Sequence, residues 1–283
     1  MAQLTFIPSC KDQSAHQPSH NLPRETDHDL APARGILTGM KICEVHHLGL
    51  IDYQLAWDLQ NQYAAEIASG QRPATLLFLE HPHTFTFGRR GQIANLLWGE
   101  DELARRGVTV HWVDRGGDVT YHGPGQLVGY PLIPLEKLSS SGDHIPQADY
   151  VGYIRKLEQM VITAVANFGV EARQMEGLTG VWVDHESTGV THQSATIAKL
   201  AAIGVKVDAH GVTRHGFAIN LNPDMSFWEG IIGCGLEYPE ISLAQLVNPT
   251  PTMESVREAV TQSFGQTFNY LIINKEIKTN EKT

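Results

Sequence analysis

The chain has 283 residues, 42% of them apolar and 18% charged, the composition of an ordinary globular protein with enough chain for a sizeable core. Acidic residues outnumber basic ones by 31 to 21, and the net charge of −10 argues against nonspecific binding to nucleic acid or to an anionic membrane. An anionic partner would need a local basic patch. The arginine pairs Arg89-Arg90 and Arg105-Arg106 are the candidates, although solvated surface explains either pair equally well.

The three cysteines, Cys10, Cys43 and Cys234, are too few for a disulfide framework. Because no secretory signal is recognised either, we expect the protein in the reducing cytoplasm. No apolar run approaches the roughly 18 residues that a membrane-spanning helix needs.

Residues 1–38 are predicted to be a disordered N-terminal extension, since they are rich in Pro, Ser, His and Asp and their apolar residues follow no helical or strand period. Acidic residues within this stretch argue against an organelle transit peptide. We expect a single folded domain over 39–274 and a flexible, charged tail over 275–283.

In chain order, hydrophobic periodicity predicts an irregular succession of strands and helices. Apolar residues at three- and four-residue steps indicate helices over 55–67, 149–165 and 252–264. Buried or alternating apolar runs predict strands over 42–48, 75–79, 84–87, 108–113, 127–133, 180–183, 195–207 and 216–221. Strands grouped on both sides of a helix, rather than regular strand–helix alternation, favour an α+β fold with a mixed sheet and flanking helices.

The stretch Asp114–Gln126 lies between the predicted strands 108–113 and 127–133 and is therefore expected to form a hairpin. Four glycines within ten positions let its backbone turn tightly or approach a ligand closely. The polar residues between the glycines are more numerous than a purely structural hairpin needs. The stretch is therefore predicted to bind a ligand.

Common cofactor and metal signatures are missing from the sequence. It has no Gly-x-x-x-x-Gly-Lys-Ser/Thr phosphate loop, and Gly123-Pro124-Gly125 followed by Gly129 does not match the dinucleotide-binding pattern. Its 14 histidines include no His-Glu-x-x-His pair, and there is no Cys-x-x-Cys motif. We therefore expect no cofactor and no catalytic metal.

Two residues have unusual neighbours. Cys234 is flanked by Gly233 and Gly235, which leave a sulfur approachable and backbone N–H groups available to an oxyanion; a nucleophile and a structural cysteine fit this pattern equally. Lys199 interrupts the apolar segment 197–203. Position alone favours the solvent face of a half-buried strand for Lys199. The alternative is a desolvated lysine that lowers the pKa of a neighbouring thiol.

Four motifs carry a resemblance to a known family. They are Arg115–Pro131, Lys199–Val207, Gly211–Asn220 and Gly233–Gly235, in the family's order and at family-like spacing over roughly residues 41 to 248. The sequence resembles the lipoate-protein ligase B family, the octanoyl-[acyl carrier protein]:protein N-octanoyltransferases. It departs from the usual pattern at Gly233, where family members often carry Pro.

The resemblance implies the fold of lipoate and biotin protein ligases, with residues 39–274 as the catalytic domain. It implies that Cys234 is the nucleophile that carries the acyl group as a thioester and that Lys199 is its activating base. It further implies an acyl-binding site formed by Arg115, Gly116, Gly117, Asp118, Val119, Thr120, Tyr121, His122, Ala202, Ile203, Gly204, Gly216, Phe217 and Ala218. His83 is an accessory candidate that, with His122, either orients the reacting carbonyl or makes structural hydrogen bonds.

The implied reaction is the first step of endogenous protein lipoylation, in which an octanoyl group moves from octanoyl-acyl carrier protein to a lysine of an apo lipoyl domain. The expected acceptors are the lipoyl domains of 2-oxoacid dehydrogenase complexes and the glycine cleavage H protein, and the enzyme is expected to be a monomer. Two nearer alternatives are an ATP-dependent lipoate or biotin ligase on the same fold and an amidotransferase that moves octanoyl groups between lipoyl domains. A noncatalytic acyl- or metal-binding protein is the more distant alternative.

Overall fold

The computed structural model describes residues 41–135, 147–186, 195–233 and 238–275. The predicted extension at 1–38 lies outside the described residues, and so does the predicted tail apart from Lys275. The expected limits of the folded domain therefore stay a prediction.

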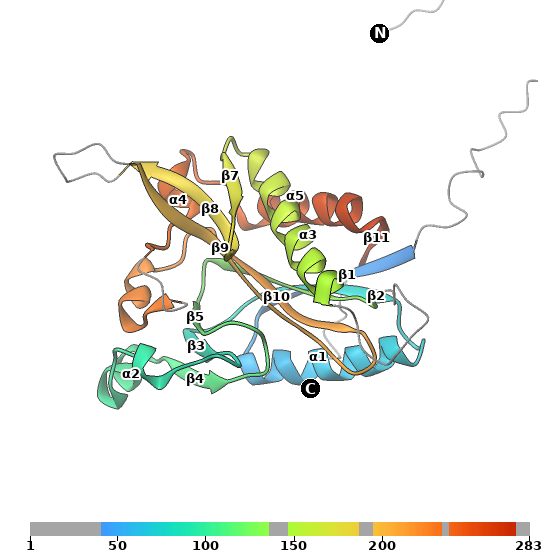
Figure 1. Ribbon diagram of the computed structural model, residues 1–283, viewed down its shortest axis with the longest axis horizontal. Helices are drawn as coiled ribbons and strands as arrows, with labels where there is room; N and C mark the ends of the chain where they lie inside the picture. The colour runs from blue at the N-terminus through green and yellow to red at the C-terminus, as the bar shows by residue number, and fades with distance from the viewer. Residues whose placement is uncertain (1–40, 136–146, 187–194, 234–237, 276–283) are drawn as a thin grey trace, which may run out of the picture. The chain divides into compact units, whose positions relative to one another are not determined.

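The described strands form a main sheet of eight strands and a separate sheet of three (Figure 1). The order in the main sheet is β11-β1-β2-β6-β10-β9-β8-β7, with β1 parallel to β11 and β2 and the other neighbouring pairs antiparallel. Its strands are β1 (Lys41–Leu50), β2 (Ala74–Glu80), β6 (Gln126–Leu132), β7 (Ala172–Met175), β8 (Leu178–Glu186), β9 (Ala195–Val207), β10 (Thr213–Asn220) and β11 (Tyr270–Lys275). This mixed sheet, flanked by helices, confirms the predicted α+β class.

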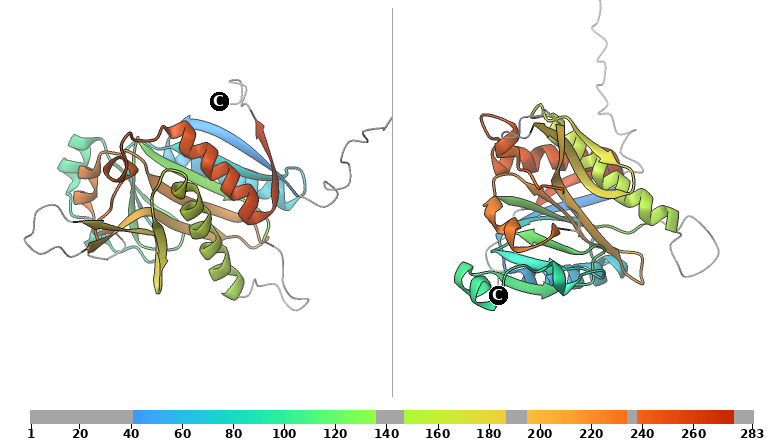
Figure 2. Two further views of the ribbon diagram at one scale, coloured as in Figure 1. Left: turned by 90° about the horizontal axis from the view of Figure 1, so that it is seen from above. Right: turned by 60° about the vertical axis from the view of Figure 1, so that its left-hand side comes forward.

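Different helices cover the two faces of the main sheet (Figure 2). The long helices are α1 (Tyr53–Ala68), α3 (Gln147–Ala166) and α5 (Met253–Phe268). Successive residues of β2 show the division, because Leu77 packs in the core under α1 whereas Leu76 packs in the core under α3 and α5. Within the described ranges, every helix is too short or too polar to cross a membrane.

The glycine-rich stretch does not form the predicted hairpin. The strands before and after it belong to different sheets, since β4 (Thr109–Trp112) pairs in parallel with β3 (Thr84–Phe87) in the small sheet and β6 lies in the main sheet. The stretch itself contains β5 (Val119–His122), whose four residues are all buried and pair antiparallel with β3. Gly125, at φ +85°, then redirects the chain to β6. The flanking strands do not pair because the short strand between them takes its own partner.

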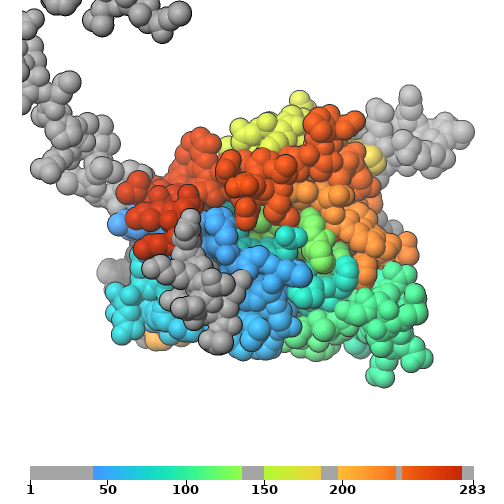
Figure 3. All heavy atoms as spheres, turned by 180° about the vertical axis from the view of Figure 1, so that it is seen from behind, coloured from blue at the N-terminus to red at the C-terminus, as the bar shows by residue number. Residues whose placement is uncertain are grey.

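Several short elements have no periodic signal that would predict them. They are β7, β11, α2 (Glu100–Arg106), α4 (Leu243–Leu246) and two 3-10 helices at Ile93–Asn95 and Met225–Gly230. Because α2 buries only Leu103, it lacks an apolar stripe. Lys275, which the sequence analysis expects in a frayed tail, instead ends β11, with its Nζ 3.3 Å from Oε1 of Glu44. The C-terminal part of the described chain (red) lies beside β1 (blue) in Figure 3.

The close contact between β6 and β10 depends on two glycines. A Cβ at Gly129 would lie 2.1 Å from Cζ of Phe217, and a Cβ at Gly216 would lie 2.1 Å from the carbonyl oxygen of Gly129. The missing side chains therefore let the Phe217 ring lie across the neighbouring strand.

We predict that Gly129→Ala lowers the free energy of unfolding by about 1–3 kcal/mol, because overpacking of this contact forces the Phe217 ring to move. The matched control is Gly152→Ala on α3, where a Cβ would meet no heavy atom within 4 Å. This alanine should stabilise the helix by about 0.5–1 kcal/mol. Urea denaturation followed by circular dichroism measures both changes, and changes of the same sign and size would contradict this account of the strand contact.

Candidate active site

A cavity of about 1040 Å³ is lined by the loop 114–118 and by β9 and β10. Most of the residues that the resemblance assigns to the acyl-binding site lie on its wall: Arg115, Gly116, Gly117, Asp118, Thr120, His122, Ala202, Ile203, Gly204, Gly216, Phe217 and Ala218. Lys199 lines the same cavity. So do residues that the sequence analysis does not assign to the acyl-binding site, among them Tyr53, Asp114, Tyr130, Tyr150, Lys206 and His215. Apolar and charged side chains share the wall, which suits a ligand with an apolar chain and a polar end.

Three of the predicted site residues do not line the cavity. Along β5 the side chains alternate, so Thr120 and His122 face the cavity while Val119 and Tyr121 pack with the aromatic core of the small sheet. His83 lies outside the cavity wall as well; its Nδ1 is 2.9 Å from the Tyr121 hydroxyl and its ring stacks on Phe227 with centroids 3.8 Å apart. These contacts are those of the structural alternative for His83.

Lys199 is buried, with 3% of its side chain exposed, so the expectation that it lies on the solvent face is wrong. Its Nζ lies 3.5 Å from Oε1 of Glu240 and 4.8 Å from the centroid of the Trp182 ring. The segment that carries Glu240 runs alongside Lys199 and covers it, since the N–H of Ile241 donates to the Lys199 carbonyl (2.9 Å) and the N–H of Lys199 donates to the Pro239 carbonyl (2.9 Å). This covering segment is distant in sequence, which explains why the apolar pattern around Lys199 misses it.

Glu240 is the functional candidate that the sequence patterns miss. Its side chain is 8% exposed, and it forms a buried ion pair with Lys199. Burial raises the pKa of the Glu240 carboxyl, while the positive charge of Lys199 and its hydrogen bond act in the opposite direction. Glu240 therefore compensates the charge of Lys199 from behind the cavity wall that Lys199 lines.

Cys234 lies outside the described residues, but the residue before it is described. A Cβ at Gly233 would lie 3.6 Å from Oε1 of Glu240 and 3.4 Å from Cζ3 of Trp228. The chain that leads into Cys234 thus passes next to the carboxylate that pairs with Lys199. At these distances a Cβ at Gly233 would make ordinary van der Waals contacts with both neighbours.

A series of hydrogen bonds fixes the protonation of His122. Gln126 donates its Nε2 hydrogens to the carbonyl of Tyr121 (3.1 Å) and to Oδ1 of Asn220 (2.9 Å), so its Oε1 must accept a hydrogen from Nδ1 of His122 (2.8 Å). Burial lowers the pKa of His122 well below its usual value. His122 is therefore a neutral wall residue whose Nε2 lone pair faces the hydroxyl of Thr86 at 3.5 Å.

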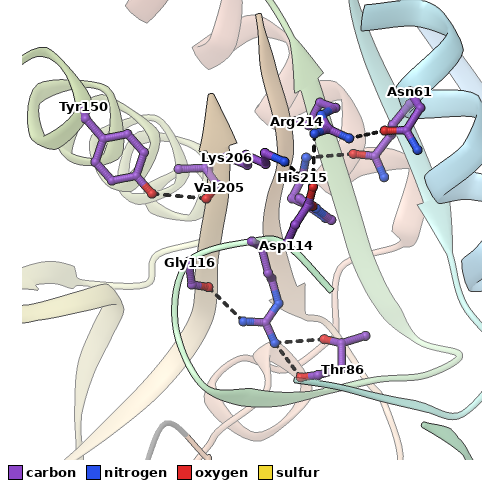
Figure 4. Close-up of polar contacts among 11 residues, drawn as sticks. Asn61, Thr86, Asp114, Gly116, Tyr150, Val205, Lys206, Arg214 and His215 are labelled. Carbon is purple, nitrogen blue, oxygen red and sulfur yellow. Dashed lines mark hydrogen bonds and ion pairs between the residues drawn. The ribbon is translucent and has the colours of Figure 1, made fainter. Parts of the chain in front are cut away.

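Arg115 is held on the wall by hydrogen bonds to the small sheet. Its Nη2 donates to the carbonyl oxygen of Thr86 (2.6 Å) and to Oγ1 of Thr86 (2.9 Å), and its Nη1 donates to the carbonyl of Gly116 (2.9 Å; Figure 4). The guanidinium group therefore braces the turn of the loop 114–118 against β3.

Asp114 ties the same loop to the main sheet (Figure 4). Its Oδ1 accepts a hydrogen bond from Nε2 of His215 (2.7 Å), and its Oδ2 contacts Nη2 of Arg214 (3.1 Å) and the ammonium group of Lys206. Burial alone would raise the pKa of Asp114, but hydrogen bonds from His215 and Lys206 and the charge of Arg214 lower it well below its usual range. His215 is held at φ +55° and its N–H donates to Oε1 of Gln60 on α1 (2.7 Å). The residue that anchors the loop 114–118, His215, thus has a left-handed backbone conformation that is uncommon for any residue other than glycine.

Comparison with known proteins matches most of the chain. The family model for the lipoyl protein ligase A/B catalytic domain matches residues 52–265. An octanoyltransferase of Chloroflexus aurantiacus is 43% identical over 230 residues, which cover 81% of this chain and 95% of the relative. An octanoyltransferase of Solibacter usitatus is 41% identical over 231 residues, which cover 82% of this chain and 95% of the relative.

Solved structures resemble this one in fold at low sequence identity. A bipartite lipoate protein ligase of Thermoplasma acidophilum superposes on this chain with a TM-score of 0.61 at 14% identity. The superposition includes 86% of this chain and 89% of the ligase chain. A lipoate-protein ligase A bound with ATP gives a TM-score of 0.57 at 13% identity, with 86% of this chain and 91% of its own covered. The predicted fold of lipoate protein ligases is confirmed by these likenesses.

We predict that Asp114→Asn lowers the free energy of unfolding at pH 7 by about 1–2 kcal/mol, because it removes the anion that three basic groups share. The loss is no larger because solvent screens the charges of this partly exposed site. The pKa of Asp114 is lower in the folded protein than in the unfolded chain, so its stabilisation is complete above about pH 4 and is lost as the pH falls further. The difference between variant and wild type should therefore be constant above about pH 5 and should shrink as the pH falls from about 4 to about 2 in urea denaturation.

The matched control is Asp184→Asn, which removes a single ion pair with Arg173 (2.5 Å) from a carboxylate that is 59% exposed. A surface pair of this kind should contribute less than about 0.5 kcal/mol. If Asp114→Asn behaves like Asp184→Asn, or costs as much at pH 3 as at pH 7, the anchoring role of Asp114 is wrong.

Proposed function

Because the chain belongs to the lipoyl protein ligase A/B catalytic-domain family, we propose that it transfers an octanoyl group from octanoyl-acyl carrier protein to a lysine of a lipoyl domain by way of a thioester on Cys234. The chain is an acyltransferase of the octanoyltransferase branch of this family. In this proposal the acceptors are the lipoyl domains of 2-oxoacid dehydrogenase complexes and the glycine cleavage H protein.

The observation that carries the proposal is the buried Lys199–Glu240 pair beside the entry of Cys234. Gly233, just before Cys234, lies against the Glu240 carboxylate, and Pro239, which follows it, is hydrogen bonded to the Lys199 backbone. The described chain on both sides of Cys234 is therefore next to Lys199 or to its ion-pair partner. One residue adds at most about 3.8 Å between Cα atoms. This supports the proposal that the sulfur of Cys234 reaches the ammonium group of Lys199.

Before the donor binds, the amine of Lys199 takes the proton of the Cys234 thiol, so the two residues stand as an ammonium group, paired with Glu240, and a thiolate. In the first half-reaction this thiolate attacks the carbonyl carbon of the donor thioester. The tetrahedral intermediate collapses by breaking the bond to the pantetheine sulfur, and Lys199 returns the proton to that leaving group. Exchange of one thioester for another is close to isoenergetic, so this step needs no ATP. Throughout, the Glu240 carboxylate stabilises the ammonium group that Lys199 becomes.

In the second half-reaction the amine of the acceptor lysine attacks the thioester on Cys234. Lys199 removes a proton from the attacking nitrogen, and the thiolate of Cys234 leaves. An amide forms from a thioester, which makes this half downhill. His122, neutral and fixed by Gln126, adds no competing positive charge to the wall.

The cavity wall offers apolar surface for the acyl chain from Ile203, Phe217 and Ala218. Each methylene buried there contributes about 0.8 kcal/mol, so an eight-carbon chain is distinguished from much shorter ones. The glycines of the same wall let the chain approach the backbone closely.

We predict that the wild-type protein gains the mass of one octanoyl group when it is mixed with octanoyl-acyl carrier protein, and that hydroxylamine removes this mass because the bond is a thioester. Cys234→Ala should gain none. The matched control is Cys43→Ala, which should keep the adduct, because Cys43 is fully buried in the main core and burial raises the pKa of its thiol to about 12.

Intact-mass spectrometry reads out each protein. If Cys234→Ala instead transferred free octanoate in the presence of ATP at the wild-type rate, the chain would be an ATP-dependent ligase. A wild-type protein that gains no mass would overturn covalent catalysis.

We predict that Glu240→Gln lowers kcat/KM by at least about tenfold and moves the alkaline limb of its pH profile to lower pH. Without the carboxylate, the ammonium group of Lys199 loses the negative charge that stabilises it, so it gives up its proton at lower pH. Glu240→Asp should restore part of the profile, because it keeps the charge. The measurement is the rate of single-turnover acylation from pH 5 to pH 10, with thermal unfolding as the test of folding. A folded Glu240→Gln variant with an unchanged pH profile would show that Glu240 only fills space.

A further inference from the structure

The arginine pairs Arg89-Arg90 and Arg105-Arg106, which the sequence analysis treats as equal candidates for an anion-binding patch, have different surroundings in the structure. Arg105 and Arg106 on α2 both pair with the carboxylate of Glu102 (2.5 Å each), and the guanidinium group of Arg106 lies 4.2 Å from the centroid of the Trp98 ring. Packing and ion pairing therefore account for this pair.

Arg89 and Arg90, in contrast, line the cavity. Their backbone is fixed to the loop 114–118, because the N–H of Arg89 donates to the carbonyl of Arg115 (2.9 Å) and the N–H of Arg90 donates to the carbonyl of Gly117 (3.1 Å). Both side chains are exposed, and among the described residues neither forms an ion pair or a side-chain hydrogen bond. Their positive charges also act on the hydroxyl of Tyr150 on α3: burial raises the pKa of Tyr150, and the two arginines lower it in part.

Two carboxylates of the loop to which this pair is bonded, Asp118 and Asp114, already have partners. Asp118 accepts hydrogen bonds from the Asn95 amide (2.5 Å) and from the N–H groups of Gln92 (3.1 Å) and Val119 (2.7 Å). Asp114 is compensated by the basic cluster around His215. Two uncompensated guanidinium groups thus remain at the rim of the cavity in a protein with a net charge of −10.

We propose that Arg89 and Arg90 bind the phosphate of the donor's phosphopantetheine arm. This inference rests on the proposed function, in which the donor is a thioester carried on such an arm. Arginine is suited to the role because its planar fork binds phosphate oxygens through paired, charge-assisted hydrogen bonds.

The dimensions of the cavity fit an arm that lies along β9. The loop that carries the arginine pair adjoins Val205, because the N–H of Gly116 donates to the Val205 carbonyl (2.9 Å). Six residues of extended strand separate Val205 from Lys199, roughly 20 Å at about 3.3 Å per residue. The arm has about a dozen bonds between sulfur and phosphorus, or about 15 Å when extended by the same reckoning as a peptide chain. The lysine and arginine side chains span the difference.

The test compares three donors: octanoyl-acyl carrier protein, octanoyl-4′-phosphopantetheine and octanoyl-pantetheine, of which the last lacks the phosphate. We expect the wild type to be half-saturated by octanoyl-4′-phosphopantetheine at an at least tenfold lower concentration than by octanoyl-pantetheine in single-turnover acylation. The double variant Arg89→Gln/Arg90→Gln should lose this preference and keep its rate at saturating octanoyl-pantetheine. Arg105→Gln, which also removes one exposed arginine charge, is the matched control and should keep the preference.

Two results would overturn the inference. If the double variant keeps the phosphate preference but binds octanoyl-acyl carrier protein more weakly, the pair contacts carboxylates on the carrier protein. If donor kinetics are unchanged and the KM for the lipoyl domain rises, the pair serves the acceptor.

Calorimetric titration with 4′-phosphopantetheine and with pantetheine decides the question even without transfer. Weaker binding of 4′-phosphopantetheine to the double variant than to the wild type supports the phosphate site, and equal binding rejects it. If none of the three donors acylates the wild type, the proposed function is rejected. The calorimetric comparison of 4′-phosphopantetheine with pantetheine then still decides whether Arg89 and Arg90 bind the phosphate.

Discussion

Burial of the positive charge of Lys199 is the constraint on which the site depends. An ammonium group in a protein interior is strongly unfavourable without a partner, so Glu240 must lie beside it and the segment 239–241 must dock on β9. The two backbone hydrogen bonds to Lys199 hold that segment in place. Such a pair adds little net stability, because the cost of desolvating both charges offsets their attraction. Its presence at a cavity wall therefore points to chemistry rather than to folding.

The cavity exists because the chain changes sheets within the glycine-rich stretch. β5 pairs in the small sheet, whereas β6 pairs in the main sheet. The loop 114–118 before β5 and the strand β9 of the main sheet therefore both line the cavity between them. Asp114 fastens this loop to β10, and Arg115 fastens it to β3. The charges of the loop are satisfied by these anchors. Beyond these anchors, the cavity wall carries Lys199 on β9, paired with Glu240, and the arginine pair Arg89-Arg90 beside the loop 114–118.

Much of the fold could be predicted from local pattern. The strand at 195–207 has the bounds of β9, and the helix capped by Thr252 corresponds to α5, because both have strong apolar periodicity. What could not be predicted depends on contacts between distant segments or on weak periodicity. The burial of Lys199 requires Glu240, which lies 41 positions later in the chain. The hairpin prediction failed because β5 has only four residues and its pairing partner, β3, precedes it by more than thirty.

The site residues divide in the same way. Most residues of the motifs that carry the family resemblance come together on the wall of one cavity, but a continuous motif does not distinguish the two faces of a strand. Val119 and Tyr121 therefore belong to the core of the small sheet, although their neighbours Thr120 and His122 line the cavity. The same fold also occurs in a lipoate-protein ligase A bound with ATP, so the fold does not choose between adenylate and thioester chemistry. That choice is made by individual groups. An acyl group that arrives as a thioester is already activated, and it needs only one group that accepts and returns a proton. In the proposed thioester reaction Lys199, whose charged form is supported by the buried carboxylate of Glu240, would be that group, and no nucleotide would be needed.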